Sequence, residues 1–239
     1  MMNFADILAE KAKRVGIIFS QEQLDIFTLY FVKLIQTNEK INLTAITNPE
    51  EVAVKHFIDC LTVYDDKYFP DSAKICDVGT GAGFPGLPLK IYKDKLQVTL
   101  LDSLAKRLIF LNELIEQLKL KGVKTCHSRA EDAGRSAQHR GKYDVVLARA
   151  VAPLNILCEY CLPLVKTGGV FVAMKAKQGE EELRHAQQAI ETLGAQVLEI
   201  RKIQLPGLVD ERVVIYLGKN KSAPNIYPRK AGTPVKNPL

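Results

Sequence analysis

The sequence predicts an α/β protein built on a Rossmann-like, mostly parallel sheet of seven strands with a small helical amino-terminal extension. From about residue 73, short apolar runs alternate with helical segments, and only a turn at Pro206-Gly207 separates the last two runs. Alternation of strands and helices is typical of βαβ units, whose parallel sheet is covered on both faces. A turn between two consecutive strands favours an antiparallel pair at one edge of that sheet.

The first 60 residues are predicted to be helical from their capping signals. Ser20 and Gln23 form a capping box before an apolar helical face, and Asn48-Pro49 places a cap before a proline at the first helical position. The seven strands are expected at Ile75–Val78, Gln97–Leu101, Val123–His127, Tyr143–Ala148, Gly169–Met174, Gln196–Ile203 and Arg212–Leu217. Helices are expected at Lys106–Leu118, Leu154–Leu164 and Glu180–Leu193.

These elements divide the chain into three parts. Residues 1–70 form the helical extension, residues 71–218 the main domain, and residues 219–239 a basic tail that contains prolines. The tail has five basic residues, four prolines and no acidic residue, which is typical of extended chain. It is either a disordered end or a segment that folds across the site, where its basic residues would meet RNA.

Charge and cysteine usage limit the classes of function. Lysine and arginine number 33 against 27 aspartate and glutamate residues, and the excess lies after residue 70, where 26 basic residues face 17 acidic ones. A basic body favours a polyanionic partner such as nucleic acid. Five scattered cysteines indicate the reduced thiols of a cytoplasmic protein. The sequence contains no run of about 18 apolar residues, so no membrane span is predicted. We also expect the protein to be a monomer.

A glycine-rich turn follows the first strand and carries the strongest local signal. Asp77 ends the strand, and Gly79, Gly81 and Gly83 let the backbone approach a ligand closely. Asp102 ends the next strand, where a carboxylate can bind a ribose diol. The pattern also fits the dinucleotide fingerprint. We favour S-adenosylmethionine over NAD, because Asp77 suits a cation and Pro85 removes an N–H that a phosphate would need.

The ends of the third and fourth strands add to this prediction. Ser128 to Asp132 offers a backbone N–H and carboxylates that could read an adenine edge, and Ala148-Arg149-Ala150 follows the fourth strand. The Asp- or Asn-Pro-Pro-aromatic motif that holds an exocyclic amine in many methyltransferases is absent at this point. An acceptor such as guanine N7 already owns a lone pair, so it needs orientation more than deprotonation.

Several segments together resemble one known family, the bacterial 16S ribosomal RNA guanine-N7 methyltransferases, also called the glucose-inhibited division protein B family. The resemblance spans nearly the whole chain, and its segments are Asn42-Leu43-Thr44, Lys55-His56, Asp59, Asp77 to Gly86, Arg129-Ala130-Glu131, Ala148-Arg149-Ala150 and Tyr227-Pro228-Arg229-Lys230-x-Gly232-x-Pro234. It implies a class I methyltransferase domain over residues 71–218 that transfers a methyl group from S-adenosylmethionine to N7 of a guanine in 16S rRNA, near the decoding site. It also implies donor contacts by Gly79, Phe84, Ala130, Glu131 and Arg149.

Candidate site residues follow from these two lines of argument. The donor is expected to contact Gly79, Gly81, Gly83, Phe84, Asp102, Ala130, Glu131 and Arg149. His56 and Arg149 are the catalytic candidates, although His56 could equally tie the helical extension to the core. Contacts with RNA phosphates are expected from Lys106, Arg107, Lys175, Arg229 and Lys230. No metal is required, and Cys158-x-x-Cys161 is interpreted as two buried thiols.

Three other functions stay open on the sequence. One is a methyltransferase with a different acceptor, against which the basic rim argues weakly. Another is a ribosome-binding factor with a vestigial donor site, against which the intact Asp77, glycine turn and Asp102 argue. The third is a nicotinamide oxidoreductase, which binding of NADH would reveal.

Overall fold

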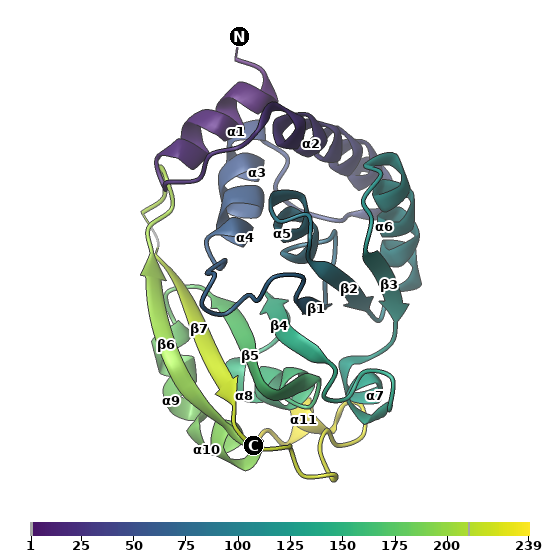
Figure 1. The fold of residues 1–239 in the computed structure, drawn as a ribbon, viewed down its shortest axis with the longest axis vertical. Helices are drawn as coiled ribbons and strands as arrows, with labels where there is room; N and C mark the ends of the chain where they lie inside the picture. Colours follow the sequence, from purple (N-terminus) through teal and green to yellow (C-terminus); the bar gives the residue numbers. More distant parts are fainter. Residues whose placement is uncertain (1, 210) are drawn as a thin grey trace.

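A seven-stranded sheet forms the centre of the molecule in the computed structural model, which describes residues 2–209 and 211–239 (Figure 1). The first residue of the predicted extension, Met1, and residue 210 of the predicted main domain lie outside this description. The strands lie in the order β3-β2-β1-β4-β5-β7-β6. Their bounds are β1 Lys74–Val78, β2 Gln97–Asp102, β3 Val123–His127, β4 Tyr143–Arg149, β5 Val165–Lys175, β6 Ala195–Ile203 and β7 Arg212–Lys219.

The five strands β1 to β5 pair with one another in parallel. Strand β7 runs antiparallel to both of its neighbours, β5 and β6. The predicted antiparallel pair is therefore present, with β7 inserted beside β5 and β6 at the edge. The parallel register pairs Val78 with Leu101 and with Ala148. The residues that follow these positions thus meet at one edge of the sheet, which we call the carboxyl edge.

Helices cover both faces of the sheet (Figure 1). One face carries the amino-terminal helices with α5 (Gly86–Tyr92) and α6 (Ala105–Gln117), and the other carries α7 (Ala130–Arg135), α8 (Leu154–Cys161), α9 (Gly179–His185) and α10 (Gln187–Thr192). A separate hydrophobic cluster fills the space on each face. Burial on both faces explains why the central strands are continuous apolar runs without polar alternation.

The amino-terminal extension begins with two capped helices, α1 (Phe4–Lys13) and α2 (Gln21–Ile41). The predicted capping box at the start of α2 is present: Ser20 Oγ accepts from Gln23 N–H and Gln23 Oε1 from Ser20 N–H. The predicted helix after Asn48 is less regular than expected. Its first turn, α3 (Pro49–Val52), leads into a π-helix, η1 (Ala53–Ile58), and then α4 (Asp59–Leu61). Wide π turns arise from tertiary demands, so periodicity does not predict them.

Two further predictions needed adjustment. The helix expected over 180–193 is two short helices that meet at Ala186, and no glycine or proline in the sequence marks the break. Of the two alternatives for the tail, the structure shows a folded segment, which packs against α7 and α8 and contains a short helix, α11 (Thr233–Lys236), where extended chain was expected. Its partners lie far back in the sequence, so local composition gives no sign of them.

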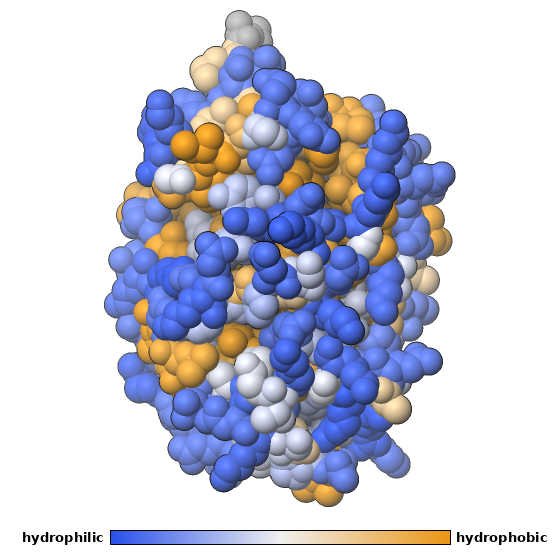
Figure 2. All heavy atoms as spheres, viewed as in Figure 1, coloured by the Kyte–Doolittle hydropathy of each residue, from blue (hydrophilic) through white to orange (hydrophobic). Residues whose placement is uncertain are grey.

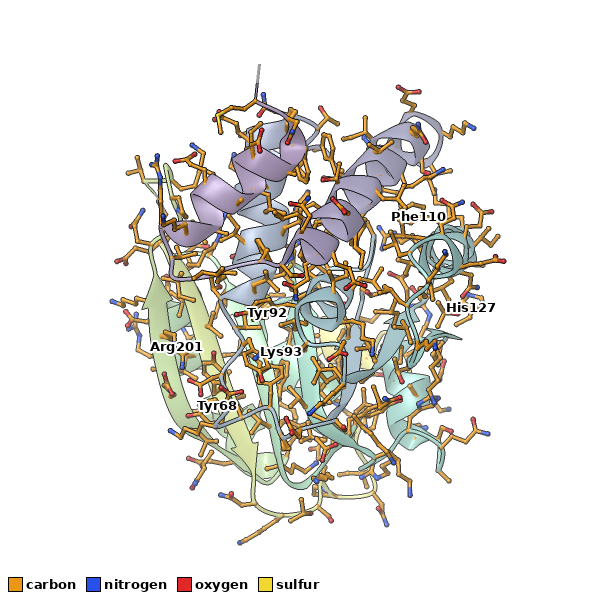
Figure 3. All side chains as sticks on the ribbon, turned by 45° about the horizontal axis from the view of Figure 1, so that its top comes forward. Tyr68, Tyr92, Lys93, Phe110, His127 and Arg201 are labelled. Atoms are coloured by element: carbon orange, nitrogen blue, oxygen red, sulfur yellow. The ribbon has the colours of Figure 1, made fainter. Side chains whose placement is uncertain are left out.

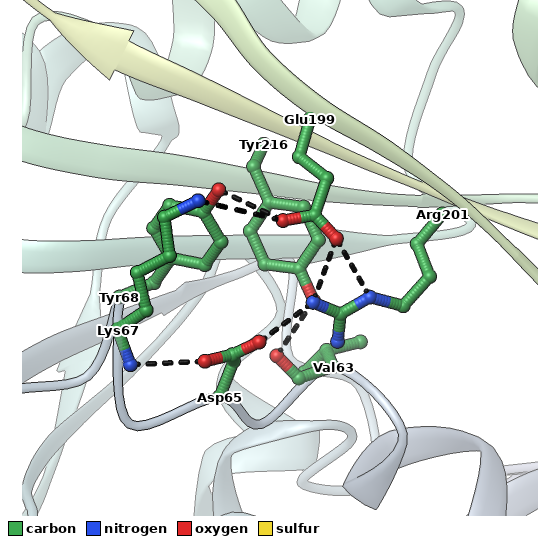
Figure 4. Close-up of polar contacts among 7 residues, drawn as sticks. All are labelled: Val63, Asp65, Lys67, Tyr68, Glu199, Arg201 and Tyr216. Atoms are coloured by element: carbon green, nitrogen blue, oxygen red, sulfur yellow. Dashed lines mark hydrogen bonds and ion pairs between the residues drawn. The ribbon is translucent and has the colours of Figure 1, made fainter.

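A polar network fastens the loop after α4 to the antiparallel edge of the sheet (Figure 4). Arg201 donates to Asp65 and Glu199, and Glu199 accepts from the Tyr68 hydroxyl. Tyr216 Oη donates to the Val63 carbonyl. In Figure 3, Arg201 and His127 lie toward opposite edges of the sheet, whereas Tyr92 and Lys93 lie at the end of α5.

The face seen in Figure 2 is mainly hydrophilic, with the broadest hydrophobic patches near the amino-terminal helices. Within the described residues, no helix combines the length and apolar character needed to cross a membrane.

Candidate functional site

The glycine turn between β1 and α5 is shaped by three residues with positive φ. Gly79, Gly81 and Gly83 have φ of 71°, 60° and 101°, in the region that favours glycine. The turn is anchored to β2, because the N–H groups of Gly79 and Thr80 both donate to the Leu101 carbonyl. A Cβ on Gly79 would lie 2.6 Å from Val151 Cγ2, so this glycine also allows the loop after β4 to approach.

Asp77 organises the glycine turn from its buried side and does not face a ligand. Its Oδ2 accepts from the Thr80 hydroxyl at 2.7 Å and from Gly86 N–H at 2.9 Å. The side chain is fully buried, and burial raises the pKa of this carboxyl to about 6. Among the described residues Asp77 Oδ1 has no hydrogen-bond partner. The prediction that Asp77 suits a bound cation thus needs correction: its carboxylate stabilises the backbone that forms the site.

Asp102, at the end of β2, is held at the same edge. Its Oδ2 accepts from Gly81 N–H at 3.0 Å, and its Oδ1 accepts from Leu104 N–H at 2.9 Å. Arg107 Nη1 lies 3.2 Å from Oδ2. Arg107, one of the predicted RNA contacts, therefore pairs with Asp102, the residue that is predicted to bind the ribose. A carboxylate has about four acceptor positions, so Asp102 retains capacity for a further donor.

A cavity of about 260 Å³, the donor cavity, opens at these strand ends. Of the predicted donor contacts it is lined by Gly79, Asp102, Ala130 and Glu131, which come from three different segments. Gly81, Gly83, Phe84 and Arg149 are not in its wall. The full lining consists of Val78, Gly79, Leu101, Asp102, Ser103, Arg107, Ser128, Arg129, Ala130, Glu131, Ala150, Val151 and Tyr160.

A second cavity of about 350 Å³, the acceptor-side cavity, lies beside the first. The two share one lining residue, Ala150, which has φ of 56° in the loop after β4. The wall of the second cavity consists of Ile46, Lys55, His56, Asp59, Arg149, Ala150, Met174, Lys175, Ala176, Glu182, Arg212, Val213 and Val214. The catalytic candidates His56 and Arg149 thus lie together in the wall of the acceptor-side cavity.

Arg149 joins the helical extension to the sheet. Its Nη1 donates to Asp59 Oδ2 and to the Lys55 carbonyl, each at 3.0 Å. Asp59 is also 3.7 Å from Arg212 Nε. Burial raises the pKa of the Asp59 carboxyl and the two guanidinium groups oppose this. The π-helix supplies both the carbonyl and His56, and no local sequence signal predicts that arrangement.

His56 is neutral and has a defined orientation. Burial, aided by the nearby Arg149 charge, lowers its pKa from 6.5 to about 4. Arg149 Nη2 lies 3.4 Å from Nδ1, and the Thr44 hydroxyl oxygen lies 2.8 Å from Nε2. Since a guanidinium can only donate, Nδ1 is the acceptor and Nε2 carries the proton that is donated to Thr44. His56 therefore ties the extension to the core and also lines the acceptor-side cavity, while its catalytic or RNA-contacting role stays a prediction.

Phe84 lies behind the cavities. Its ring stacks on His56 at 4.8 Å and on Tyr30 at 5.4 Å, and the Arg149 guanidinium lies 5.1 Å from its centroid. Tyr30 Oη donates to the Ala82 carbonyl at 2.5 Å, which connects α2 directly to the glycine turn. The predicted contact of Phe84 with the donor would therefore involve its backbone, because its side chain is in the core.

The predicted RNA contacts fall into two groups. Lys106 and Lys230 are exposed and available to a partner. The others are engaged within the protein: Lys175 with Glu182 and the Ala152 carbonyl, Arg229 with Glu159, and Arg107 with Asp102. For Lys175 and Arg229 the expected phosphate contact conflicts with this pairing, since only 8% and 21% of their side-chain surface is exposed.

Several lining residues were not predicted from the sequence, among them Glu182, Arg212 and Tyr160. Glu182 accepts from Leu154 N–H and Lys175, and so holds the loop after β4. None of these three lies in a motif, and only the tertiary fold brings them to the site. Cys158 and Cys161 are buried thiols, as predicted. Within the described residues no group of three side chains could hold a metal ion.

Comparison with solved structures confirms the predicted fold. M. jannaschii TYW2 in complex with AdoMet matches with a TM-score of 0.51 and 16% identity, covering 86% of this chain and 80% of that chain. A 16S rRNA (adenine(1408)-N(1))-methyltransferase from Catenulisporales acidiphilia, solved with cosubstrate SAM, matches with a TM-score of 0.52 and 14% identity, covering 64% and 88%. At these identities the likeness concerns the fold alone, which is the Rossmann-like fold of class I methyltransferases.

Sequence comparison is more specific. The family model described as rRNA small subunit methyltransferase G matches residues 23–213. The ribosomal RNA small subunit methyltransferase G of Desulforamulus reducens is 48% identical over 232 residues and covers 97% of each chain. That of Lactobacillus delbrueckii subsp. bulgaricus is 46% identical over 236 residues, 98% of this chain and 99% of the relative. On the evidence of this match, which includes the glycine turn, Asp102, Glu131 and Arg149, the chain belongs to the rRNA small subunit methyltransferase G family.

Proposed function

We propose that this protein transfers a methyl group from S-adenosylmethionine to N7 of a guanine in 16S rRNA, near the decoding site. The observation that carries the proposal is the pair of cavities that share Ala150 at the carboxyl edge. Parallel α/β sheets bind their ligands at this edge. Two adjoining cavities allow a donor and an acceptor to meet at the shared residue, and the family's printed name supports RNA of the small subunit as substrate.

The residues of the donor cavity fit S-adenosylmethionine. Asp102 ends β2 with acceptor capacity for a ribose diol, and Glu131 adds a second carboxylate beside the backbone of Ala130. No phosphate has to be accommodated, which agrees with the glycine turn. Gly86 N–H, which a pyrophosphate would need in a dinucleotide site, already donates to Asp77, and the N–H groups of Gly83 and Phe84 donate to Thr80. This internal use of donors argues against the NAD alternative.

The chemistry required of the protein is mainly orientation. When bound, the donor supplies a methyl group on a sulfonium, which the guanine N7 lone pair can attack in line. No proton has to leave N7, so the neutral His56 and the fixed Arg149 need not act as bases. Instead they give the acceptor-side cavity a rigid wall in which a base can be held close to the donor. We propose that the protein does this as a monomer in the cytoplasm.

The decisive experiment uses S-adenosylmethionine labelled in its methyl group and small ribosomal subunits that lack the modification. After incubation with the protein, the RNA is digested and the labelled nucleoside identified. Label in 7-methylguanosine supports donor, acceptor atom and substrate together. Donor binding without label in RNA would move the acceptor elsewhere. Absence of donor binding in calorimetry would refute the proposal, and NADH binding would then favour the oxidoreductase alternative.

A further inference from the structure

The side chain of Glu131 is divided between the donor cavity and the carboxy-terminal segment, residues 220–239. Glu131 Oε1 accepts from Gly232 N–H at 3.0 Å. Oε2 has no hydrogen-bond partner among the described residues, yet it is not among their fully buried unpaired atoms. Because the residue is 4% exposed and lines the donor cavity, the open side of this carboxylate is the cavity. One oxygen is thus anchored by the segment and the other remains for a ligand.

Charged contacts fix the carboxy-terminal segment just before Gly232. Arg229 donates from its backbone N–H to Glu159 Oε1 at 2.7 Å and from its guanidinium to both oxygens of that carboxylate. Glu159 is 1% exposed and precedes Tyr160, another residue of the donor cavity. A forked guanidinium–carboxylate pair defines orientation as well as distance. Arg229 thereby determines where Gly232 lies.

Two arginines of the α7 region complete this attachment. Arg135 Nε donates to the Pro228 carbonyl at 2.7 Å. Arg140 donates to the carbonyls of Tyr227 at 2.6 Å and Ala223 at 2.8 Å. A Cβ on Gly134 would lie 2.8 Å from Pro228 Cγ, so α7 and the carboxy-terminal segment approach closely only because this residue is glycine. The segment is therefore packed against the helix that carries Glu131.

We propose that the carboxy-terminal segment is a positioning element of the donor site, in which Arg229 holds Gly232 so that its N–H orients Glu131 toward S-adenosylmethionine. The inference rests on the proposed function, because it takes the donor cavity as the place where this molecule binds. It assigns to Arg229 a role inside the protein in place of the phosphate contact expected from sequence. Arg229 and Gly232 are positioning residues, since neither lines the cavity.

The test is a double-mutant cycle in the full-length protein, with the dissociation constant of S-adenosylmethionine measured by calorimetry. Because Arg229→Met would disturb the hydrogen bond from Gly232 N–H to the charged Glu131, we expect it to raise the dissociation constant roughly tenfold. In a Glu131→Ala background the same change should have less than about a twofold effect, because no carboxylate remains to be oriented. Lys236→Met, at an exposed position of the same segment, is the matched control and should leave the constant unchanged.

A second variant covers the case in which Arg229→Met fails to fold. Gly232 has φ of 83°, and a Cβ there would meet nothing within 4 Å, so Gly232→Ala strains the backbone without a clash and spares the Arg229–Glu159 pair. It should weaken donor binding in the wild-type background only. An equal loss in both backgrounds, or no loss in either, would overturn the inference. If the unaltered protein bound no S-adenosylmethionine, the proposed function itself would fail.

Discussion

His56 shows how neighbouring groups set the chemical state of a side chain. The sequence placed it in the helical extension and paired it with Asp59, but it did not predict that both would contact Arg149 at the end of β4. Contacts between residues 90 or more positions apart have no local signature. The neutral form, the tautomer and the stacking on Phe84 all follow from those contacts. Motif reasoning therefore identified the residue, and the structure supplied its contacts.

The lowered pKa of His56 predicts a pH dependence of stability. Between pH 6.5 and about 4 the unfolded chain binds a proton at this residue while the folded protein does not. The contribution of His56 to the free energy of unfolding is therefore fully present above pH 6.5. It decreases by about 3 kcal/mol as pH falls through this range. Denaturant unfolding at several pH values should show this loss in the wild type relative to His56→Gln, whose side chain does not titrate.

The comparison with a variant is necessary because Asp77 has the opposite effect. Its pKa is raised to about 6, so its contribution is largest at low pH and is lost as pH rises through 6. The two effects partly cancel in the wild type. If the difference between wild type and His56→Gln stayed constant from pH 7 to 4, the pKa of His56 would be the same in the folded and the unfolded protein, and burial would not lower it.

The glycine turn is the element that the sequence predicted best, because its constraints are local. Positive φ at three glycines is a backbone requirement that residue type reveals directly. The π-helix was missed because it depends on contacts with β4, and the two short helices at Ala186 were missed because no breaker residue marks them. Elements defined by their own sequence were predicted, whereas elements shaped by distant partners were not.

Gly79→Ala should weaken binding of S-adenosylmethionine by about tenfold or more. Besides the cost of about 1 kcal/mol for positive φ, its Cβ would displace Val151, which lines the donor cavity. Gly141→Ala is the matched control, since it has φ of 63° and nothing within 4 Å of its Cβ. Calorimetry should detect the loss of binding only in Gly79→Ala, while thermal unfolding should show destabilisation of both. Equal donor affinities would mean that Val151 moves away from the cavity.

The contact between α2 and the glycine turn can be tested in the same paired way. Tyr30→Phe removes the hydrogen bond to the Ala82 carbonyl, and Tyr216→Phe removes a similar bond to the Val63 carbonyl, far from the turn. Both tyrosines are fully buried, so each change should lower the free energy of unfolding by about 1–2 kcal/mol. Only Tyr30→Phe should also reduce donor affinity. A parallel loss in Tyr216→Phe would show that the effect is general destabilisation.

The whole molecule combines an acidic extension with a basic main body. Residues 1–70 hold 7 basic and 10 acidic residues, and the rest of the chain holds the basic excess. Charge composition correctly indicated a polyanionic partner in agreement with the family, but it did not distinguish free lysines from paired ones. The pairing of Arg229 with Glu159 and of Lys175 with Glu182 was not predicted, because these partners are distant or belong to another element. Exposure decides which charges can reach RNA.

Approach of RNA to the carboxyl edge predicts a directional charge effect. Lys106 is exposed beside the donor cavity, whereas Lys142 is exposed at the opposite edge, near the amino ends of the strands. Lys106→Ala should weaken binding to small ribosomal subunits and reduce the slope of log K against log salt by roughly 0.7–0.9, the value for one phosphate contact. Lys142→Ala should alter neither quantity. Filter binding at several salt concentrations measures both, and the reverse ranking would place RNA on the other edge.

The bond from Gly232 to Glu131 has a consequence for how the protein is made. A chain leaves the ribosome from its amino end, so Glu131 and the whole sheet emerge before residue 232 does. Domains often begin to fold during synthesis. This domain can form its sheet while Glu131, in the wall of the donor cavity, still lacks the hydrogen bond from Gly232 N–H. A partly made chain would then hold its methyl donor weakly. Competence would arrive only after residue 232 has been synthesised and has left the ribosome, after which the enzyme can act on the ribosomal RNA of other particles.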